Sequence, residues 1–491
     1  MTSQPSQISA PAGGHSKIMA AAAAAATAGL LFLGSGLHPI WWTTWLFPLP
    51  ALLVAPRLTR RAAFLAAAAG WFAGTINMWH YLLAAVELPL LLAFLFSALP
   101  ACLFGAAVLL FRRFAGTRRA WCAAAALPTF WVTVEYVNNV ASRDGTFLNL
   151  GYTQMNFLPM VQIASVTGLW GITFCVLIAS SALAAFICSK GARQGSRMAA
   201  ATLIWLAALL AWGEWRVLRT PTPQRLVKVT LLASGVGTTF PRNDAAAIGL
   251  LGDYAAKAER AAASGVDLIV LPEKIALVSE AGANQGDALF SSLASRTGAA
   301  VLAGIDRGTL TRRFNEARLY FPEGGKAVYD KHHMVPRAED VDQPGTSIMV
   351  LRQPSGTWGM EICKDMDFPA LSRSYGRAGT ALLVVPAWDF TLDAWLHGRM
   401  AIMRGVESGF TIVRAAKQGT LTVSDDRGRV LAEQDSASVP FATLEALAPV
   451  RHDDTLYSHW GDWFAWLNAA GFAGLLLAGR AGSSSGFRAP G

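Results

Sequence analysis

The stretch Gly359-Met-Glu-Ile-Cys-Lys-Asp-Met-Asp-Phe-Pro369 contains the one cysteine of this chain that has polar surroundings, Cys363. The other four cysteines lie inside long apolar runs. Cys363 ends an apolar segment and precedes Asp365, Asp367 and Pro369, a pattern typical of the start of a helix. A thiol at such a strand-to-helix turn faces free backbone N–H groups, which favour the thiolate. Cys363 is therefore a candidate nucleophile, and the alternative is a buried structural cysteine.

The composition is typical of a membrane protein with a soluble part. Of the 491 residues, 53% are hydrophobic and only 15% are charged, and the mean hydropathy is +0.37. A bilayer is crossed by roughly 20 apolar residues in a helix. Apolar runs of about this length cover residues 17–36, 38–56, 62–84, 88–111, 120–138, 159–189, 198–217 and 460–479. We therefore predict about eight transmembrane helices.

These runs divide the chain into five regions. We predict a cytoplasmic tail (1–16), a seven-helix membrane domain (17–219), a globular domain (220–458), a last membrane helix (459–480) and a disordered cytoplasmic tail (481–491). The Ala-rich start of the first run resembles a signal peptide. Because further apolar runs follow directly, we expect an uncleaved first helix.

The basic residues predict the orientation of the chain in the membrane. One side of the predicted topology holds Lys17, Arg57, Arg60, Arg61, Arg112, Arg113, Arg118, Arg119, Lys190, Arg193, Arg197, Arg480 and Arg488. The loops of the other side hold only Arg143. We expect both termini in the cytoplasm of a bacterium, the chain in its inner membrane and the globular domain in the periplasm. Because the net charge of +9 comes from the cytoplasmic side, nucleic acid is not an expected partner.

Short β-branched runs alternate with amphipathic helical segments in the globular domain, which predicts a layered α/β fold. Expected strands cover 226–233, 267–271, 299–305, 317–321, 327–329, 358–362, 382–385, 411–414 and 421–424. Expected helices cover 245–263, 288–296, 370–377 and 393–408. In such folds the chemistry gathers at the carboxyl ends of strands.

Two charged residues stand at the ends of these strands, Glu273 and Lys331. A carboxylate as base, an ammonium as electrostatic partner and a thiol as nucleophile form a workable set for acyl transfer. Taken singly, Glu273 could be a solvated carboxylate and Lys331 a surface lysine. The neighbouring His332 and His333 would point to opposite faces of an extended segment, so we expect no metal site and no cofactor.

Three motifs, in this order, resemble landmarks of the carbon–nitrogen hydrolase (nitrilase) superfamily. They are Leu271-Pro-Glu-Lys274, Tyr329-Asp-Lys-His-His-Met-Val-Pro336 and Met360-Glu-Ile-Cys363, with further similarity at Arg313-Phe-Asn-Glu-Ala317 and Val385-Pro-Ala-Trp-Asp389. The resemblance implies a nitrilase-like αββα sandwich with a catalytic triad of Glu273, Lys331 and Cys363.

The membrane helices narrow the resemblance to the apolipoprotein N-acyltransferase family, whose loop into the sixth span is similar to Leu148-Asn-Leu-Gly-Tyr-Thr-Gln154 and Gly168-Leu-Trp-Gly-Ile-Thr-Phe174. That family transfers an acyl chain from a membrane phospholipid to the N-terminal amine of a diacylated lipoprotein cysteine. The resemblance implies these two partners and a thioester intermediate on Cys363. We expect the chain to act as a monomer.

The resemblance also implies roles for individual residues. Glu273 would be the general base, and Lys331 with the backbone N–H of Lys364 would hold the oxyanion. Glu339 matches a further carboxylate of the family. Lys364 and Asp365 stand where the family usually has Tyr-Glu, so Asp365 would supply that carboxylate on a shorter side chain.

Two other functions are compatible with the same residues. The protein could be a membrane-tethered amidase or nitrilase-like hydrolase that uses water as the acyl acceptor. It could also be a channel or scaffold with a decayed domain, although a decayed site should have lost at least one of Glu273, Lys331 and Cys363. Glu135, inside a predicted span, is interpreted as an interfacial residue or a proton relay.

Overall fold

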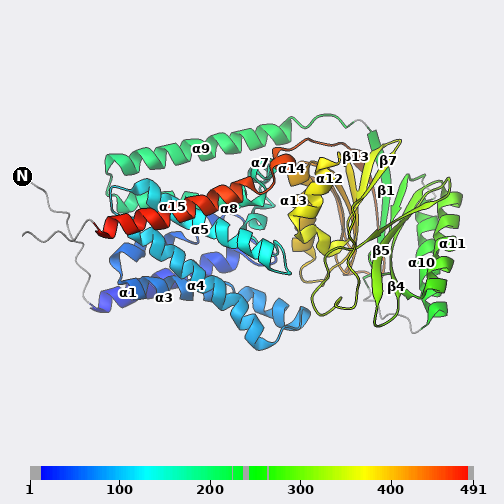
Figure 1. Ribbon diagram of the computed structural model, residues 1–491, viewed down its shortest axis with the longest axis horizontal. Coiled ribbons are helices and arrows are strands. Elements are labelled where there is room, and N and C mark those ends of the chain that lie inside the picture. The colour runs from blue at the N-terminus through cyan, green and yellow to red at the C-terminus, as the bar shows by residue number, and fades with distance from the viewer. Residues whose placement is uncertain (1–12, 224, 236–242, 263–264, 485–491) are drawn as a thin grey trace, which may run out of the picture.

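The computed structural model describes residues 13–223, 225–235, 243–262 and 265–484. The molecule is elongated, with a helical bundle at one end and a layered α/β domain at the other (Figure 1). The predicted tails 1–16 and 481–491 lie mostly outside the described residues, and the last helix continues to Ser484.

The bundle combines the N-terminal part of the chain with its last helix (Figure 1). Its helices are α1 (Gly13–Gly34), α2 (Leu49–Val54), α3 (Arg60–Gly74), α4 (Leu90–Phe114), α5 (Ala120–Ala141), α6 (Leu158–Val161), α7 (Ala164–Thr167), α8 (Leu169–Cys188), α9 (Arg193–Leu218) and α15 (Trp463–Ser484). Within the described residues, four of them, α1, α4, α8 and α9, are long and apolar enough to cross a membrane.

Three predicted spans are interrupted in the structure. In the run 38–56, only the six residues of α2 form an α-helix, because Pro39 and Pro48, which precede it, lack the N–H groups that a helix interior needs. In the run 62–84, α3 ends at Gly74 and is followed by the 3-10 turn η3 (Ile76–Met78) and the π-helical segment η4 (Tyr81–Ala85). The run 159–189 is divided into α6, α7 and α8, and Gly168 at φ +67° separates the last two helices. The count of eight spans remains a prediction.

The α/β domain contains two sheets that face each other. The first has the order β13-β1-β2-β4-β5-β6, with β3 beside β4, and the second has the order β12-β11-β10-β9-β8-β7. The first comprises β1 (Arg225–Ala233), β2 (Leu268–Val270), β3 (Leu277–Val278), β4 (Ala300–Gly308), β5 (Arg313–Tyr320), β6 (Lys326–Asp330) and β13 (Ala442–Val450). The second comprises β7 (Met349–Gln353), β8 (Gly356–Met360), β9 (Leu382–Trp388), β10 (Thr411–Lys417), β11 (Thr420–Ser424) and β12 (Val430–Asp435).

Helices cover the outer face of each sheet, so the layers are α, β, β and α (Figure 1). Side chains of both sheets, among them Val229, Leu302, Met360 and Val413, form the core between them. Helices α10 (Asp244–Ala261) and α11 (Glu280–Thr297) pack on the first sheet. Helices α12 (Pro369–Arg377) and α13 (Ala394–Ser408) lie over the second. The predicted sandwich is confirmed.

Helix α13 also joins the α/β domain to the bundle. Its buried side chains Leu396, Met400, Met403 and Val406 belong to the same apolar core as the bundle helices. The short helix α14 (Leu456–Trp460) adds Tyr457 to this core before the chain enters α15. Burial of apolar surface on both faces of α13 therefore holds the two parts together.

The strand directions bring the predicted site residues to one edge of the sandwich. Glu273 follows β2, Lys331 follows β6 and Cys363 follows β8. Strands β2 and β4 are parallel, and β5 is antiparallel to both β4 and β6. The carboxyl ends of β2 and β6 consequently point the same way, and β8 approaches from the facing sheet.

Candidate active site

Glu273 and Lys331 form a buried ion pair. The Lys331 Nζ donates to Glu273 Oε1 at 2.8 Å and to Glu339 Oε2 at 2.8 Å. Asn315, on β5, donates through Nδ2 to Glu273 Oε1 at 2.6 Å and to Glu339 Oε1 at 3.1 Å. Gly304 allows this approach, because a Cβ there would lie 2.6 Å from the Glu273 Cα. The structure thus brings three of the sequence-predicted residues into direct contact.

A second lysine, Lys274, forms ion pairs with Glu339 and with carboxylates farther from Lys331. Lys274 Nζ lies 2.7 Å from Glu339 Oε1, 2.8 Å from Asp342 Oδ2 and 3.6 Å from Asp306 Oδ2. Arg313 pairs with Asp342 at 2.7 Å. Buried charges are tolerated only when paired and hydrogen-bonded, so these groups fix one another's positions.

Cys363 begins the 3-10 turn η7 (Cys363–Asp367) and has φ +45°, a conformation that L-residues rarely adopt. Its side chain is partly exposed, and Sγ donates to the backbone carbonyl of Trp388 at 3.4 Å. Such strain persists only where the surroundings over-determine it, and it concentrates at functional sites. The predicted strand-to-helix turn is confirmed.

Asp365 supplies much of that restraint. Its Oδ2 accepts the N–H of Ile362 at 3.1 Å and the hydroxyl of Tyr329 at 2.7 Å. Its Oδ1 accepts the backbone N–H groups of His332 at 3.1 Å and His333 at 2.8 Å. The Asp365 carboxylate therefore joins the cysteine turn to the segment that follows β6.

The remaining predicted residue, Lys364, is held by carboxylates from both parts of the molecule. Its Nζ lies 3.2 Å from Asp367 Oδ2 and 3.7 Å from Asp144 Oδ1, and Asp144 belongs to the bundle. His332 stacks on Tyr329 and His333 on Phe368, so the two rings occupy separate aromatic contacts.

The charges around the thiol set the protonation states at rest. Burial, and then the negative charge of Glu273, raise the pKa of Cys363 well above its ordinary value. Burial alone would lower the pKa of Lys331, but Glu273 and Glu339 raise it well above its ordinary value. Burial opposes ionisation of Glu339, but Lys331 and Lys274 hold its pKa below its ordinary value. The resting site therefore has a neutral thiol beside an ion-paired carboxylate. The expectation that the turn favours the thiolate is wrong, because burial and the charge of Glu273 raise the pKa of the thiol.

Sequence reasoning missed several residues of this centre. Asn315 and Asp389 lie within the two strand motifs, and Asp389 forms an ion pair with the buried Arg414. Lys417 donates to the carbonyl of Lys274 at 2.7 Å and lies over the Trp388 ring, and burial lowers the pKa of Lys417 to about 7. For Lys417 a signal was present in the sequence, because Arg414 and Lys417 are charged residues in the otherwise apolar strand β10.

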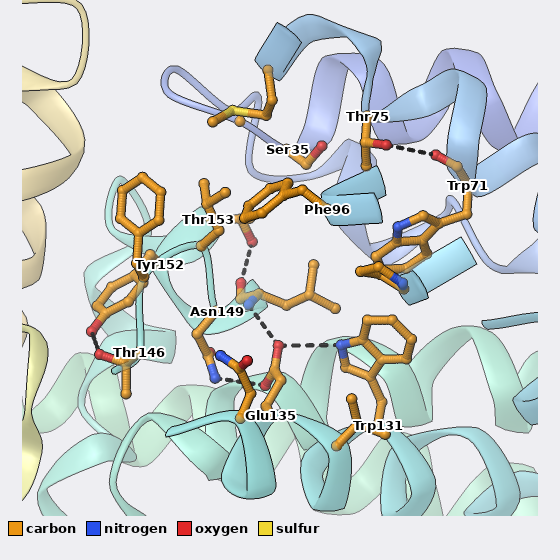
Figure 2. Close-up of a pocket in the computed structure, with 18 of the residues that line it drawn as sticks. Ser35, Trp71, Thr75, Phe96, Trp131, Glu135, Thr146, Asn149, Tyr152 and Thr153 are labelled. Carbon is orange, nitrogen blue, oxygen red and sulfur yellow. Dashed lines mark hydrogen bonds between the residues drawn. The ribbon is translucent and has the colours of Figure 1, made fainter. Parts of the chain in front are cut away.

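The bundle contains an apolar cavity of about 280 Å³ beside Glu135 (Figure 2). Its walls come from α1, α3, α4, α5 and the turn after α5, and Leu396 of α13 reaches it. The Glu135 carboxylate accepts hydrogen bonds from Trp131, Asn149, Leu150 and Thr173. With four protein donors, Glu135 anchors the 149–150 segment to α5, and the two interpretations of Glu135 from the sequence, an interfacial residue or a proton relay, stay predictions.

The fold and the site together define a carbon–nitrogen hydrolase domain. The family model of carbon-nitrogen hydrolases matches residues 232–444, and that of the apolipoprotein N-acyltransferase N-terminal domain matches residues 24–183. The chain belongs to the apolipoprotein N-acyltransferase family.

Two curated relatives agree with this assignment. The apolipoprotein N-acyltransferase of Geobacter metallireducens is 29% identical, with 90% of this chain and 91% of that protein covered. That of Bradyrhizobium diazoefficiens is 27% identical, with 64% and 65% covered. Among solved structures, Saccharomyces cerevisiae Nit3, a member of the nitrilase superfamily, is 20% identical, with a TM-score of 0.40. The match covers 49% of this chain and 94% of the Nit3 chain.

Proposed function

We propose that this protein is an apolipoprotein N-acyltransferase. In this function it moves an acyl chain from a membrane phospholipid, through a thioester on Cys363, to the N-terminal amine of a diacylated lipoprotein cysteine. The observation that carries the proposal is the position of the Glu273–Lys331–Cys363 centre in a domain that shares its core with an apolar bundle through α13. A thioester suits two bulky substrates, because the acyl group is stored while they exchange.

In the first half-reaction, Glu273 takes the proton of Cys363 as the sulfur attacks the ester carbonyl of the phospholipid. Lys331 and the backbone N–H of Lys364 stabilise the oxyanion that forms. The C–O bond then breaks, and the leaving alkoxide takes the proton from Glu273. Because the pKa of Cys363 is raised, the thiol is neutral before the reaction, and the proton leaves during the attack on the carbonyl.

The second half-reaction regenerates the thiol. Glu273 accepts a proton from the incoming amine, the amine nitrogen attacks the thioester carbonyl, and the C–S bond breaks. The leaving sulfur recovers a proton from Glu273, so no cofactor is consumed. Glu339, which shares Lys331 with Glu273, keeps the lysine charged and in place through both steps.

The apolar bundle suits a donor that never leaves the bilayer. The cavity beside Glu135 has mostly apolar walls that would accommodate hydrocarbon (Figure 2). Transfer within the membrane avoids the cost of moving an acyl chain through water. The chain is proposed to act as a monomer.

We further propose eight spans in a bacterial inner membrane, with cytoplasmic termini and the α/β domain in the periplasm. The alternation of basic loops supports this orientation. A reporter that is active only in the periplasm should be active when fused after residue 220 and silent when fused at Lys190. The reverse pattern would contradict the orientation.

Acyl transfer and hydrolysis predict different products from one reaction. Membranes that contain the protein, incubated with acyl-labelled phospholipid and a lipopeptide with a free N-terminal amine, should place the label on the peptide amine. Mass spectrometry of the peptide and chromatography of free fatty acid measure the two outcomes. The relatives' names favour transfer. Label found only in free fatty acid would instead support the hydrolase with water as the acceptor.

A further inference from the structure

The turn after α5 in the bundle holds the far end of the cysteine turn. The backbone N–H of Thr146 donates to the carbonyl of Asp367 at 3.0 Å, and the Thr146 hydroxyl donates to the same oxygen at 2.7 Å. Asp367 is the last residue of η7, the turn that Cys363 begins. One carbonyl of the α/β domain thus receives two hydrogen bonds from one residue of the bundle.

Gly145 makes this contact possible. It is buried and has φ +55°, and a Cβ on it would lie 2.6 Å from the Asp367 carbonyl oxygen and 3.2 Å from the Phe368 ring. Only glycine combines this backbone conformation with so close an approach. The turn is fitted to η7 by shape as well as by hydrogen bonds.

The turn is itself held by a chain of hydrogen bonds that begins at Arg404. The Thr146 hydroxyl hydrogen is used toward Asp367, so the Tyr152 hydroxyl, 2.6 Å away, must donate to Thr146 Oγ1 (Figure 2). The Tyr152 oxygen in turn accepts from Arg404 of α13 at 2.9 Å. The hydrogen bonds run in one direction, from Arg404 through Tyr152 and Thr146 to Asp367, and such chains reinforce each member.

The two ends of η7 are therefore restrained by different domains. Asp365 holds the N-terminal end of the turn, near Cys363, against the segment after β6 in the α/β domain. Thr146 of the bundle holds the C-terminal end of the turn, at Asp367. Cys363 keeps its positive φ between these restraints.

We propose that Gly145 and Thr146 are positioning residues that set the placement of Cys363 relative to Glu273 and Lys331, so that the bundle takes part in organising the nucleophile. This inference rests on the proposed role of Cys363 as nucleophile. The same turn lines the apolar cavity, and the cavity and the cysteine turn thus share one wall.

Alkylation of Cys363 tests the inference without phospholipid or lipoprotein. The full-length protein in detergent is treated with iodoacetamide across a pH series, and mass spectrometry of the Cys363 peptide gives the rate. Wild-type protein should react at a nearly constant rate around neutral pH, because Glu273 takes the proton during attack. Thr146→Val and Gly145→Ala should react on the order of 10²-fold more slowly at pH 7, the usual cost of a ~1 Å misplacement. Their rates should rise with pH as those of an ordinary thiol do.

Matched controls lie at the other end of α5. Gly116 has φ +75°, but the nearest atom to its Cβ position is 3.7 Å away, and the Thr117 hydroxyl donates to the carbonyl of Phe114 at 2.7 Å. Gly116→Ala and Thr117→Val should keep the wild-type rate and pH profile. Thr146→Ser keeps the hydroxyl and should restore reactivity.

The results separate this inference from the proposed function. Wild-type alkylation profiles in Thr146→Val and Gly145→Ala would overturn the positioning role, and so would equal losses in Thr146→Ser and Thr146→Val. Slow, pH-dependent alkylation in Thr146→Val and Gly145→Ala, together with a wild-type protein that alkylates rapidly but transfers no acyl chain, would support the positioning role and refute the acyltransferase function.

Discussion

The Glu273→Gln protein is expected to form no detectable thioester when it is incubated with phospholipid. Glutamine keeps the shape of glutamate and can keep the contacts at Oε1, where Asn315 and Lys331 donate at 2.6 and 2.8 Å. It cannot accept the proton of Cys363, whose raised pKa leaves the thiol neutral at rest. Loss of a general base costs ~10²–10⁴ in rate.

Intact-protein mass spectrometry over a time course measures this loss. Glu259→Gln is the control, because Glu259 pairs with Arg296 on an exposed face of the α/β domain. The control should acylate at the wild-type rate. A wild-type rate in Glu273→Gln would remove Glu273 from the mechanism.

The Lys331→Met protein is expected to be slow in both half-reactions and less stable. Removal of one oxyanion donor costs ~10²–10³ in rate. The substitution also leaves Glu273 and Glu339 buried without their shared cation, and breaking a buried pair costs ~3–5 kcal/mol of folding stability. Single-turnover acylation and deacylation measure the first effect, and thermal unfolding measures the second.

The stability loss in Lys331→Met should depend on pH. Because the folded-state pKa of Glu339 is lowered, its contribution is present at neutral pH and is lost as the pH falls through that pKa. The difference between wild type and variant should therefore narrow as the pH drops below the ordinary glutamate value of ~4.3. Lys326→Met is the control: Lys326 begins strand β6, which Lys331 follows, and pairs with Asp287 at a partly exposed position, so this variant should show neither effect. A stable variant with wild-type rates would contradict the assigned role.

Local patterns predicted much of the α/β domain from the sequence. The strand that leads into Cys363, the hairpin of β5 and β6, and helix α13 were all predicted from runs of apolar and polar residues. Such runs encode their own secondary structure, because burial of one face imposes a period of 2 or 3.6. Glu273 and Lys331 could be recognised because each is a charged residue directly after a buried strand.

What escaped prediction depends on contacts between distant segments. Strand β13 pairs with β1 across more than 200 residues, with Arg225 opposite Val450, and no local pattern marks that partnership. Asn315 and Lys417 became site residues only when strands β5 and β10 were placed. The Thr146 contact to Asp367 joins two domains and has no sequence signature. In the bundle, hydropathy identified the apolar runs, but not the breaks that proline and Gly168 impose.

The covalent intermediate on Cys363 is the central claim, and mass spectrometry of the digested protein tests it most directly. Wild-type protein reconstituted in phospholipid should carry an acyl group on the Cys363 peptide that hydroxylamine removes, whereas the peptides of Cys102, Cys122, Cys175 and Cys188 should be unmodified. Cys363→Ala should lose both the adduct and transfer to a peptide amine. Full transfer activity in Cys363→Ala would contradict the mechanism and leave the domain with the fold of a carbon–nitrogen hydrolase but not its chemistry.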